Sequence, residues 1–379
     1  MVGFGKKETP SSGFVGVSGM DVEFLKGAVG KSFPFYDVRF GPETVAFYVE
    51  VDEQSLEQRF DSLRRLIRDD GYIPLLRFEG GEHIVYVIRR KKRRFTPVSV
   101  NILLLALAVV TCTLTGSLLY LNEFDIWSVE NIWVVLDPVN LWWGFVLFAI
   151  PLLSILFVHE MGHYLISRWH GLDASLPFFI PIPPIIPGFN IGTFGALISS
   201  HDPMPDRKTL FDVGVAGPLA GFAVAVPVTA IGIWLSDVTP MVAGSGEPVL
   251  GTSLLFWALV EIFHAVPVGF GLELSPVAFA GWVGLLITSI NLLPAGQLDG
   301  GHVFRAVLGS KQRWASFAAV LVMVLTGWFA FAVLVLFMGL VHPPPLNDAS
   351  PIDVKRKLVF VITVLVLVVC FVPVPFSML

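Results

Sequence analysis

Six apolar runs, each long enough to cross a lipid bilayer, constrain this chain more than any other feature of its sequence. About 20 consecutive apolar residues suffice for one helix to span the hydrocarbon core. Of the 379 residues, 54% are hydrophobic and 15% are charged, whereas roughly a quarter of the residues in soluble domains are charged. The sequence therefore predicts a polytopic α-helical membrane protein with about six transmembrane helices. The runs are residues 98–121, 141–167, 209–235, 276–298, 314–340 and 358–376.

Charge and cysteine content exclude several classes of protein. The formal net charge of −5 gives no reason to expect a nucleic-acid partner. The apolar runs make the lipid bilayer the expected partner. Both cysteines, Cys112 and Cys370, lie inside apolar runs, which excludes a disulfide framework and a thiolate metal site and predicts lipid-facing or core thiols. No signal-peptide pattern starts the chain, so we expect the first apolar run to direct it to the membrane. The sequence leaves the oligomeric state open.

The first 95 residues have the pattern of a small soluble region. Residues 1–20 are rich in Gly, Ser and Lys without periodicity, which predicts disorder. Residues 21–95 are predicted to form a small α+β domain with a β-α-β-β unit, in which one helix separates the first strand from the other two. The strand candidates lie at residues 43–52, 72–78 and 81–90.

The helix of this domain has its own boundary signals. Apolar side chains recur at helical spacing from Leu56 to Ile67, Ser55 and Gln58 match a capping box, and Gly71 marks the end. The domain has no Gly-rich phosphate loop and no cluster of ligand residues. Two interpretations therefore stay open, a regulatory or substrate-presenting domain and a module for folding and targeting.

A basic cluster, Arg89–Arg94, ends the N-terminal domain just before the first apolar run. Basic residues that flank a membrane span stay on the cytoplasmic side. We therefore expect the N-terminal domain to be cytoplasmic and residues 96–379 to form a membrane-embedded domain in the cell membrane.

Two further apolar segments do not have the pattern of a simple span. Residues 176–200 contain five prolines between positions 177 and 187, which removes the backbone donors that a lipid-exposed helix needs. We expect a re-entrant hairpin there. Residues 254–270 are interrupted by Glu261, His264 and Pro267, which predicts an interfacial or half-buried helix. Glu261 and His264 resemble half of a carboxylate metal site, but hydrogen bonding between helices is the favoured interpretation.

Residues 157–171, FVHEMGHYLISRWHG, place two histidines and a glutamate in a span, where ionisable groups are costly and are candidates for function. His159 and His163 are four residues apart, so both imidazoles lie on one helix face and can bind one zinc ion. Glu160 is rotated by about 100° from His159, beside such a metal, where it can accept a proton from water. The alternative is that the histidines form hydrogen bonds within the bundle and Glu160 pairs with a neighbour.

A tetrahedral catalytic zinc site needs three protein ligands, so another span must supply the third. The segment SINLLPAGQLDGGHV, residues 289–303, offers Asp299 at the end of the run that begins near residue 276. Pro294 is expected to end that helix, and Gly300 and Gly301 let the backbone pass close to a metal.

This metal hypothesis also predicts the membrane topology. If the N-terminal domain is inside, the histidines lie near the inner end of the second run, and Asp299 reaches the same depth only if residues 254–270 do not cross. Basic residues in the loops that this topology puts inside agree with it, whereas the basic segment at residues 353–357 falls outside and counts against it. The agreeing residues are Arg207, Lys208, Arg305, Lys311 and Arg313.

Two motifs together resemble a known family. HEMGH, residues 159–163, and NLLPAGQLDGG, residues 291–301, resemble the motifs of the site-2 protease family, zinc metalloproteases that cut other proteins within the membrane. The intervening segment LFDVGVAGPLAGF resembles the branch found in archaea, bacteria and chloroplasts. The likeness covers roughly residues 98–376 and does not include the N-terminal domain.

The resemblance implies a function and a set of site residues. It implies an intramembrane zinc metalloprotease acting on transmembrane protein substrates in regulated intramembrane proteolysis, with one zinc ion per chain on His159, His163 and Asp299. It also implies that Glu160 is the general base and that Asn291 steadies the substrate or the oxyanion. A membrane transporter is the alternative, but no internal repeat supports it. An H-E-x-x-H protease with a glutamate as third ligand lacks its downstream motif here.

Some neighbouring residues admit two interpretations. The hairpin at residues 176–200 either pairs with an extended substrate or packs the bundle as a plug. Glycines 214, 217 and 221 are expected to allow close helix packing, and His302 is taken as a loop residue rather than a partner of Asp299. Four polar residues either line a path for water or form an ordinary solvated loop, and they are His201, Asp202, Asp206 and Asp212.

Overall fold

The computed structural model describes residues 20–90, 96–123, 129, 131–185, 191–199, 202–240, 248–374 and 376–378. Residues 1–19 of the segment predicted to be disordered lie outside these ranges, and so does most of the basic cluster, the part after residue 90. The chain divides into two compact units. The first unit is Met1–Lys92 with Leu346–Ser350, and the second is Arg93–Pro345 with Pro351–Leu379.

The first unit is a small α+β fold, as predicted. Its antiparallel sheet has the strand order β1-β2-β4-β3, and its two helices pack on the sheet around one core of buried side chains. The β-α-β-β unit is present, but α1 and β1 precede it and were not predicted. The elements are α1 (Val22–Ser32), β1 (Phe35–Phe40), β2 (Thr44–Val49), α2 (Leu56–Arg68), β3 (Tyr72–Glu79) and β4 (Glu82–Arg89).

The predicted capping box at the start of α2 is wrong. Ser55 already has helical backbone angles and its side chain does not cap the helix. Its hydroxyl instead donates to the Asp52 carboxylate at 2.7 Å. Gly71 follows α2 with a φ of +82°, as its predicted place at the helix end requires.

A short segment from far along the chain completes the first unit. The edge strand β3 pairs in parallel with it at Leu76 and Asn347, and the Leu76 amide donates to the Leu346 carbonyl at 2.8 Å. The Leu346 side chain is buried in the core of this unit. Leu346–Ser350 therefore covers an edge that would otherwise leave backbone groups unpaired.

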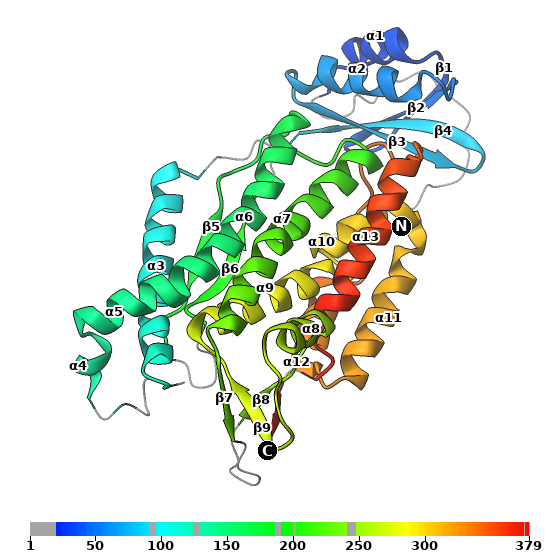
Figure 1. Ribbon diagram of the computed structural model, residues 1–379. Helices are drawn as coiled ribbons and strands as arrows, with labels where there is room; N and C mark the ends of the chain where they lie inside the picture. Colours follow the sequence, from blue (N-terminus) through cyan, green and yellow to red (C-terminus); the bar gives the residue numbers. More distant parts are fainter. Residues whose placement is uncertain are drawn as a thin grey trace. The chain divides into compact units, whose positions relative to one another are not determined.

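The second unit is mainly helical (Figure 1). Three of its described helical stretches are long and apolar enough to cross a membrane, Val98–Tyr120, Pro138–Trp169 and Arg207–Trp234. The helices are α3 (Val98–Tyr120), α4 (Ile132–Val135), α5 (Pro138–Gly144), α6 (Ile150–Trp169), α7 (Arg207–Trp234), α8 (Leu254–Phe263), α9 (Pro276–Leu292), α10 (Asp299–Leu308), α11 (Gln312–Leu325), α12 (Phe329–Met338) and α13 (Val354–Cys370). A π-helical turn (Phe145–Ala149) joins α5 to α6, and a short 3-10 helix (Gly309–Lys311) precedes α11. The strands are β5 (Phe178–Pro181), β6 (Thr193–Leu197), β7 (Asp237–Pro240), β8 (Pro248–Leu250), β9 (Phe270–Glu273) and β10 (Phe376–Met378).

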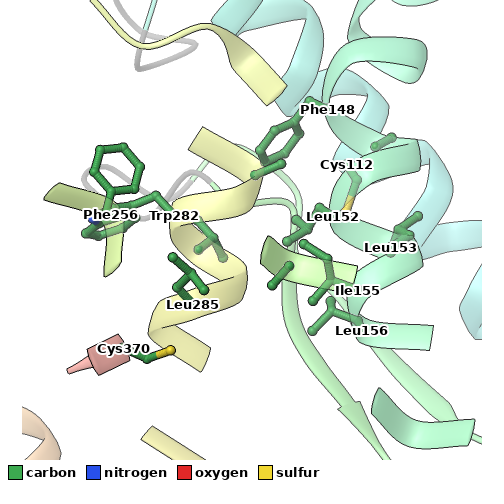
Figure 2. Packing of buried hydrophobic residues seen from close by; sticks show 14 of the residues in the cluster. Cys112, Phe148, Leu152, Leu153, Ile155, Leu156, Phe256, Trp282, Leu285 and Cys370 are labelled. Carbon is green, nitrogen blue, oxygen red and sulfur yellow. The ribbon is translucent and has the colours of Figure 1, made fainter. Parts of the chain in front are cut away.

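The core of the second unit lies where α6, α7 and α9 pack together. Figure 2 shows Leu152 and Ile155 on α6 pointing toward the helix that carries Trp282 and Leu285, which is α9. Both cysteines, Cys112 and Cys370, are fully buried in this core rather than facing lipid. This packing fixes the depth of α6 relative to α9, on which the metal hypothesis depends.

Residues 254–270 begin and end at the same side of the second unit. Strands β7 and β9 flank this segment and pair antiparallel, with Asp237 opposite Glu273. Between them α8 is only ten residues long, about 15 Å. The chain therefore returns to the end of α7 before α9 begins, as the metal hypothesis requires.

The apolar run at residues 314–340 is not one helix, which corrects the prediction of a continuous span there. It forms α11 and α12, with a break at Thr326–Trp328 where Gly327 has a φ of +83°. The two helices contact one another, so they form a helical hairpin. The apolar composition of this run concealed the break, because only Thr326 and Gly327 mark it in the middle of the run.

The predicted hairpin at residues 176–200 contains the antiparallel strands β5 and β6. Polar side chains of α3 hold it: the Asn101 amide donates to the Leu176 carbonyl at 2.8 Å, and the Thr111 hydroxyl donates to the Gly192 carbonyl at 2.6 Å. These two positions are ten residues apart on α3, about 15 Å along its axis. The hairpin therefore follows α3 for half the thickness of a bilayer core.

Candidate metal centre

Helix α6 carries the first three candidate residues. Its apolar face packs in the core, and the four-residue spacing brings both histidines to the side that faces α7 and α9. His159, Glu160 and His163 are each 6% exposed or less. Such burial of ionisable groups is costly unless they are paired or bind a metal.

Asp299 is the first residue of α10 and reaches the histidines through a tight turn. Helix α9 ends at Leu292, two residues before Pro294, as the sequence predicted. A Cβ on Gly300 would lie 2.1 Å from the Leu292 carbonyl oxygen, so only glycine lets α10 start this close to the end of α9. This close approach brings Asp299 to the depth of the two imidazoles.

The structure brings the three predicted ligands to one point. His159 Nε2 and His163 Nε2 are 3.2 Å apart, and Asp299 Oδ2 lies 3.3 Å from the first and 3.2 Å from the second. A tetrahedron around zinc with ligand bonds of about 2.0 Å has edges of about 3.3 Å. Two imidazole nitrogens and a carboxylate oxygen at these separations therefore fit three corners of a zinc site and leave the fourth for water or substrate.

A backbone carbonyl selects the tautomer of His163. Its Nδ1 lies 2.8 Å from the Val213 carbonyl oxygen on α7, and a carbonyl oxygen can only accept. The proton is therefore on Nδ1, which leaves the Nε2 lone pair free toward Asp299 and His159. Metal-binding histidines commonly use this arrangement, which fixes the ring as well as the tautomer.

The floor of the centre is a glycine surface on α7. A Cβ on Gly217 would lie 2.0 Å from His163 Nε2, and a Cβ on Gly221 would lie 3.0 Å from His159 Cβ. The predicted close packing at these glycines therefore makes room for the candidate ligands His163 and His159. Any side chain at residue 217 would occupy the position of the His163 ring.

Glu160 and Asn291 border the same site. Glu160 follows His159 on α6 and forms no hydrogen bond with any described residue. The Asn291 amide nitrogen, near the end of α9, lies 3.4 Å from His159 Nε2. A carboxylate and an amide thus flank the position that the three ligand atoms define.

The other candidate residues do not join this site. Glu261 is exposed, and His264 Nε2 donates to the Ile233 carbonyl at 2.6 Å, which is the favoured hydrogen-bonding interpretation. His302 packs its ring against His342 at 4.3 Å, and its Nδ1 lies 3.1 Å from the Leu298 carbonyl oxygen. It is therefore a packed helix residue rather than a loop residue.

The polar residues that were candidates for a water path have structural roles. Asp202 is buried and accepts from the Asp173 amide at 3.1 Å, and Asp206 caps α7 by accepting from the Thr209 amide at 2.7 Å. Asp212 is bound by side chains of two other helices. His201 lies outside the described residues.

Sequence reasoning missed the Val213 carbonyl. A backbone group has no residue-type signal, so no motif could have identified it. The spacing of Gly214, Gly217 and Gly221 was the available signal, because it predicts one small-residue face on α7. On that face Gly217 and Gly221 lie against the imidazoles of α6, and Gly214 lies against α10.

Comparison with known proteins gives consistent results. Residues 147–335 match the family model "Peptidase family M50". "Probable zinc metalloprotease EGY1, chloroplastic" is 31% identical over 242 residues in Oryza sativa subsp. japonica, 59% of this chain and 40% of that protein, and 31% identical over 256 residues in Arabidopsis thaliana, 62% and 45%. "Probable zinc metalloprotease EGY2, chloroplastic" of Arabidopsis thaliana is 32% identical over 233 residues, 59% of this chain and 41% of that protein. The chain thus spans less than half the length of these relatives.

Proposed function

This chain belongs to peptidase family M50, the site-2 protease family, and we propose that it is an intramembrane zinc metalloprotease that hydrolyses peptide bonds of transmembrane protein substrates. The observation that carries the proposal is the set of His159, His163 and Asp299, whose ligand atoms are spaced as three corners of a zinc tetrahedron on helices of an apolar unit. A transporter is not favoured, because no observation on these helices supports it.

The side chains divide the work of hydrolysis. His159, His163 and Asp299 would hold one zinc ion per chain, which would supply Lewis-acid chemistry by polarising a peptide carbonyl and acidifying water. Glu160 accepts the proton of the attacking water and returns it to the leaving amine. The Asn291 amide donates a hydrogen bond to the carbonyl oxygen as negative charge develops on it. The buried surroundings strengthen both interactions by excluding bulk water.

We propose that the chain crosses the membrane five times, through Pro138–Trp169 and helices α3, α7, α9 and α13. Support comes from the two ends of α13. Arg356 near its start is bonded to Asp212 near the start of α7, whereas β10 after its end pairs with β8, which follows α7. The α11–α12 hairpin then enters and leaves from one side, because Gln312 at the start of α11 donates to the Leu340 carbonyl after α12 at 3.2 Å. Helix α13 runs from that side to the other (Figure 1).

A topology with five crossings agrees with the distribution of basic residues. With six crossings, the basic segment at residues 353–357 would lie outside, but with five it lies inside with the other basic loops. We propose that this side is the cytoplasm, that the protein resides in the cell membrane, and that the N-terminal domain at residues 21–95 is cytoplasmic. Residues 96–379 form the protease domain, apart from Leu346–Ser350, which complete the first unit.

The β5–β6 hairpin is proposed to receive the substrate. A helical substrate must unwind to expose its carbonyls, and an extended chain can then add to a strand edge. Strand β5 packs beside α3, whereas β6 contacts α6, which carries the metal ligands. The exposed Phe194 and Leu197 on β6 give this strand an apolar surface suited to a transmembrane segment. Asn101 and Thr111 hold the hairpin against α3, a helix long and apolar enough to span a membrane, which supports re-entrance.

Replacing the proposed base tests the function. Purified Glu160→Gln protein should retain zinc and lose cleavage of a transmembrane substrate in detergent or vesicles, because the amide cannot accept the proton. Glu261→Gln is the matched control, since Glu261 is an exposed glutamate away from the site. Full turnover by the Glu160→Gln protein would reject the proposed mechanism. Comparing the proteomes of cells carrying each version would identify substrates.

A further inference from the structure

A polar cluster joins three helices near the metal centre without supplying a ligand. Its members are His170 at the end of α6, Asp212 on α7 and Arg356 on α13. Their side chains are 19%, 17% and 23% exposed, respectively. Groups this far from solvent are held in one geometry more firmly than an exposed ion pair.

The Asp212 carboxylate is bound on both of its oxygens. Arg356 Nε donates to Oδ1 at 2.7 Å, and the Arg356 Nη2 group donates to Oδ2. His170 Nε2 lies 3.0 Å from the same Oδ2. A guanidinium that grips a carboxylate through two bonds fixes the orientation of both planes. Arg356 is itself held by Asp353, the capping residue of α13.

The next residue on α7 connects this cluster to the metal centre. Val213 follows Asp212, and its carbonyl oxygen is the group that accepts from His163 Nδ1 at 2.8 Å. A helix backbone is stiff, so an anchor at Asp212 also fixes the Val213 carbonyl. Sliding α7 by one residue would move that carbonyl by about 1.5 Å, enough to break the hydrogen bond.

We propose that the Asp212–Arg356 pair, together with His170, positions the metal ligand His163. The pair holds the inner end of α7 against α6 and α13, so that the Val213 carbonyl keeps the His163 ring and its tautomer in place for zinc. Asp212 and Arg356 are thus positioning residues that never touch the metal or the substrate. The inference rests on the proposed function, but metal binding measured without substrate tests it separately.

The test compares zinc affinity in full-length protein. Asp212→Ala and Arg356→Ala should each weaken zinc binding by about 10-fold to 100-fold, the usual effect of losing a partner behind a metal ligand. Both remove the same contact, so the double variant should bind zinc no more weakly than Asp212→Ala. Zinc affinity is measured by competition with a chromogenic chelator. The cobalt(II)-substituted protein should show a changed visible spectrum, because that spectrum reports ligand geometry.

Control variants separate positioning from general stability. Arg168→Ala breaks an exposed pair with Asp173 (3.4 Å) at the same end of α6 and should leave zinc affinity and the cobalt spectrum unchanged. Arg356→Lys keeps the positive charge but cannot form two parallel hydrogen bonds to the carboxylate. Asp212→Asn keeps the shape of the side chain but loses its negative charge. These milder variants should fall between wild type and Ala, and they provide the measurement if an Ala variant does not fold.

Three outcomes are informative. Weaker zinc binding with a changed cobalt spectrum supports the inference. If the variants melt at lower temperature yet the folded protein keeps wild-type zinc affinity and spectrum, the pair is only a brace and the inference is wrong. If zinc binding weakens as expected while Glu160→Gln protein still cleaves its substrate, the proposed protease mechanism fails and the positioning role stands.

Discussion

Adding one methyl group at Gly217 should disable the metal centre. In Gly217→Ala the new Cβ would lie 2.0 Å from His163 Nε2 and 2.3 Å from Cδ2. Ordinary contact needs about 3.5 Å, so the ring or α7 has to move by about 1.5 Å. The His163 ring cannot swing aside freely, because its Nδ1 is bonded to the Val213 carbonyl.

The magnitude follows from the tolerance of the site. Metal–ligand distances hold to within about 0.2 Å, and a misplacement of about 1 Å commonly lowers activity about 100-fold. We therefore expect kcat/KM to fall by at least about 100-fold, or about 2.7 kcal/mol in transition-state stabilisation. Zinc affinity should fall as well, since the displaced group is a ligand.

Substitutions at two other glycines should have smaller effects on zinc affinity and cleavage than Gly217→Ala. In Gly221→Ala the nearest atom, His159 Cβ, would be 3.0 Å away, so we expect a loss of less than about 10-fold from a shift of a few tenths of an ångström. Gly27→Ala on α1 meets nothing within 4 Å and should change neither property. The assays are zinc affinity of the folded fraction by chelator competition and cleavage of a transmembrane substrate. Wild-type zinc affinity in Gly217→Ala would refute the assigned position of His163.

Three further predictions concern the ligands, the topology and the first unit. Asp299→Ala should lower zinc occupancy measured by atomic absorption, and unchanged occupancy would remove this carboxylate from the site. Cysteines replacing Lys311 and Lys355 should react with a membrane-impermeant thiol reagent from the same side; labelling from opposite sides would rule out the α11–α12 hairpin as proposed. Asn347→Ala should destabilise the first unit by about 1–3 kcal/mol, because its buried side chain bonds Ser350 Oγ at 2.7 Å and caps two backbone amides. Urea unfolding monitored by proteolysis of full-length protein measures this loss, and an unchanged midpoint would contradict it.

The sequence specified the grouping of the proposed metal ligands better than it specified the helices. The spacing of His159 and His163 follows from helix geometry alone, and the need for a third ligand at equal depth led to Asp299. The same argument required residues 254–270 to return to their own side, and the β7–β9 pair shows that they do. The structure groups the side chains of His159, His163 and Asp299 as inferred, because a metal centre requires particular residue types at particular distances, and their role as ligands stays a prediction.

The parts that sequence reasoning missed depend on tertiary contacts. Asp212 and Arg356 are 144 residues apart, and nothing local pairs them. The Val213 carbonyl acts through its backbone, so its side chain carries no information. The break between α11 and α12 was hidden because lipid-facing helices need apolar residues whether they cross or turn back.

The pairing of Leu346–Ser350 with β3 has a practical consequence for dissecting this protein. A protein truncated to begin after residue 92 would leave Leu346–Ser350 without the sheet with which it pairs. The N-terminal fragment on its own would expose the unpaired edge of β3, which would favour aggregation. Likewise, a single proteolytic cut after residue 92 would not release the N-terminal fragment, because the noncovalent pairing of Leu346–Ser350 with β3 would remain. Experiments that delete the N-terminal residues therefore also alter the folding of Leu346–Ser350, which belong to the same unit.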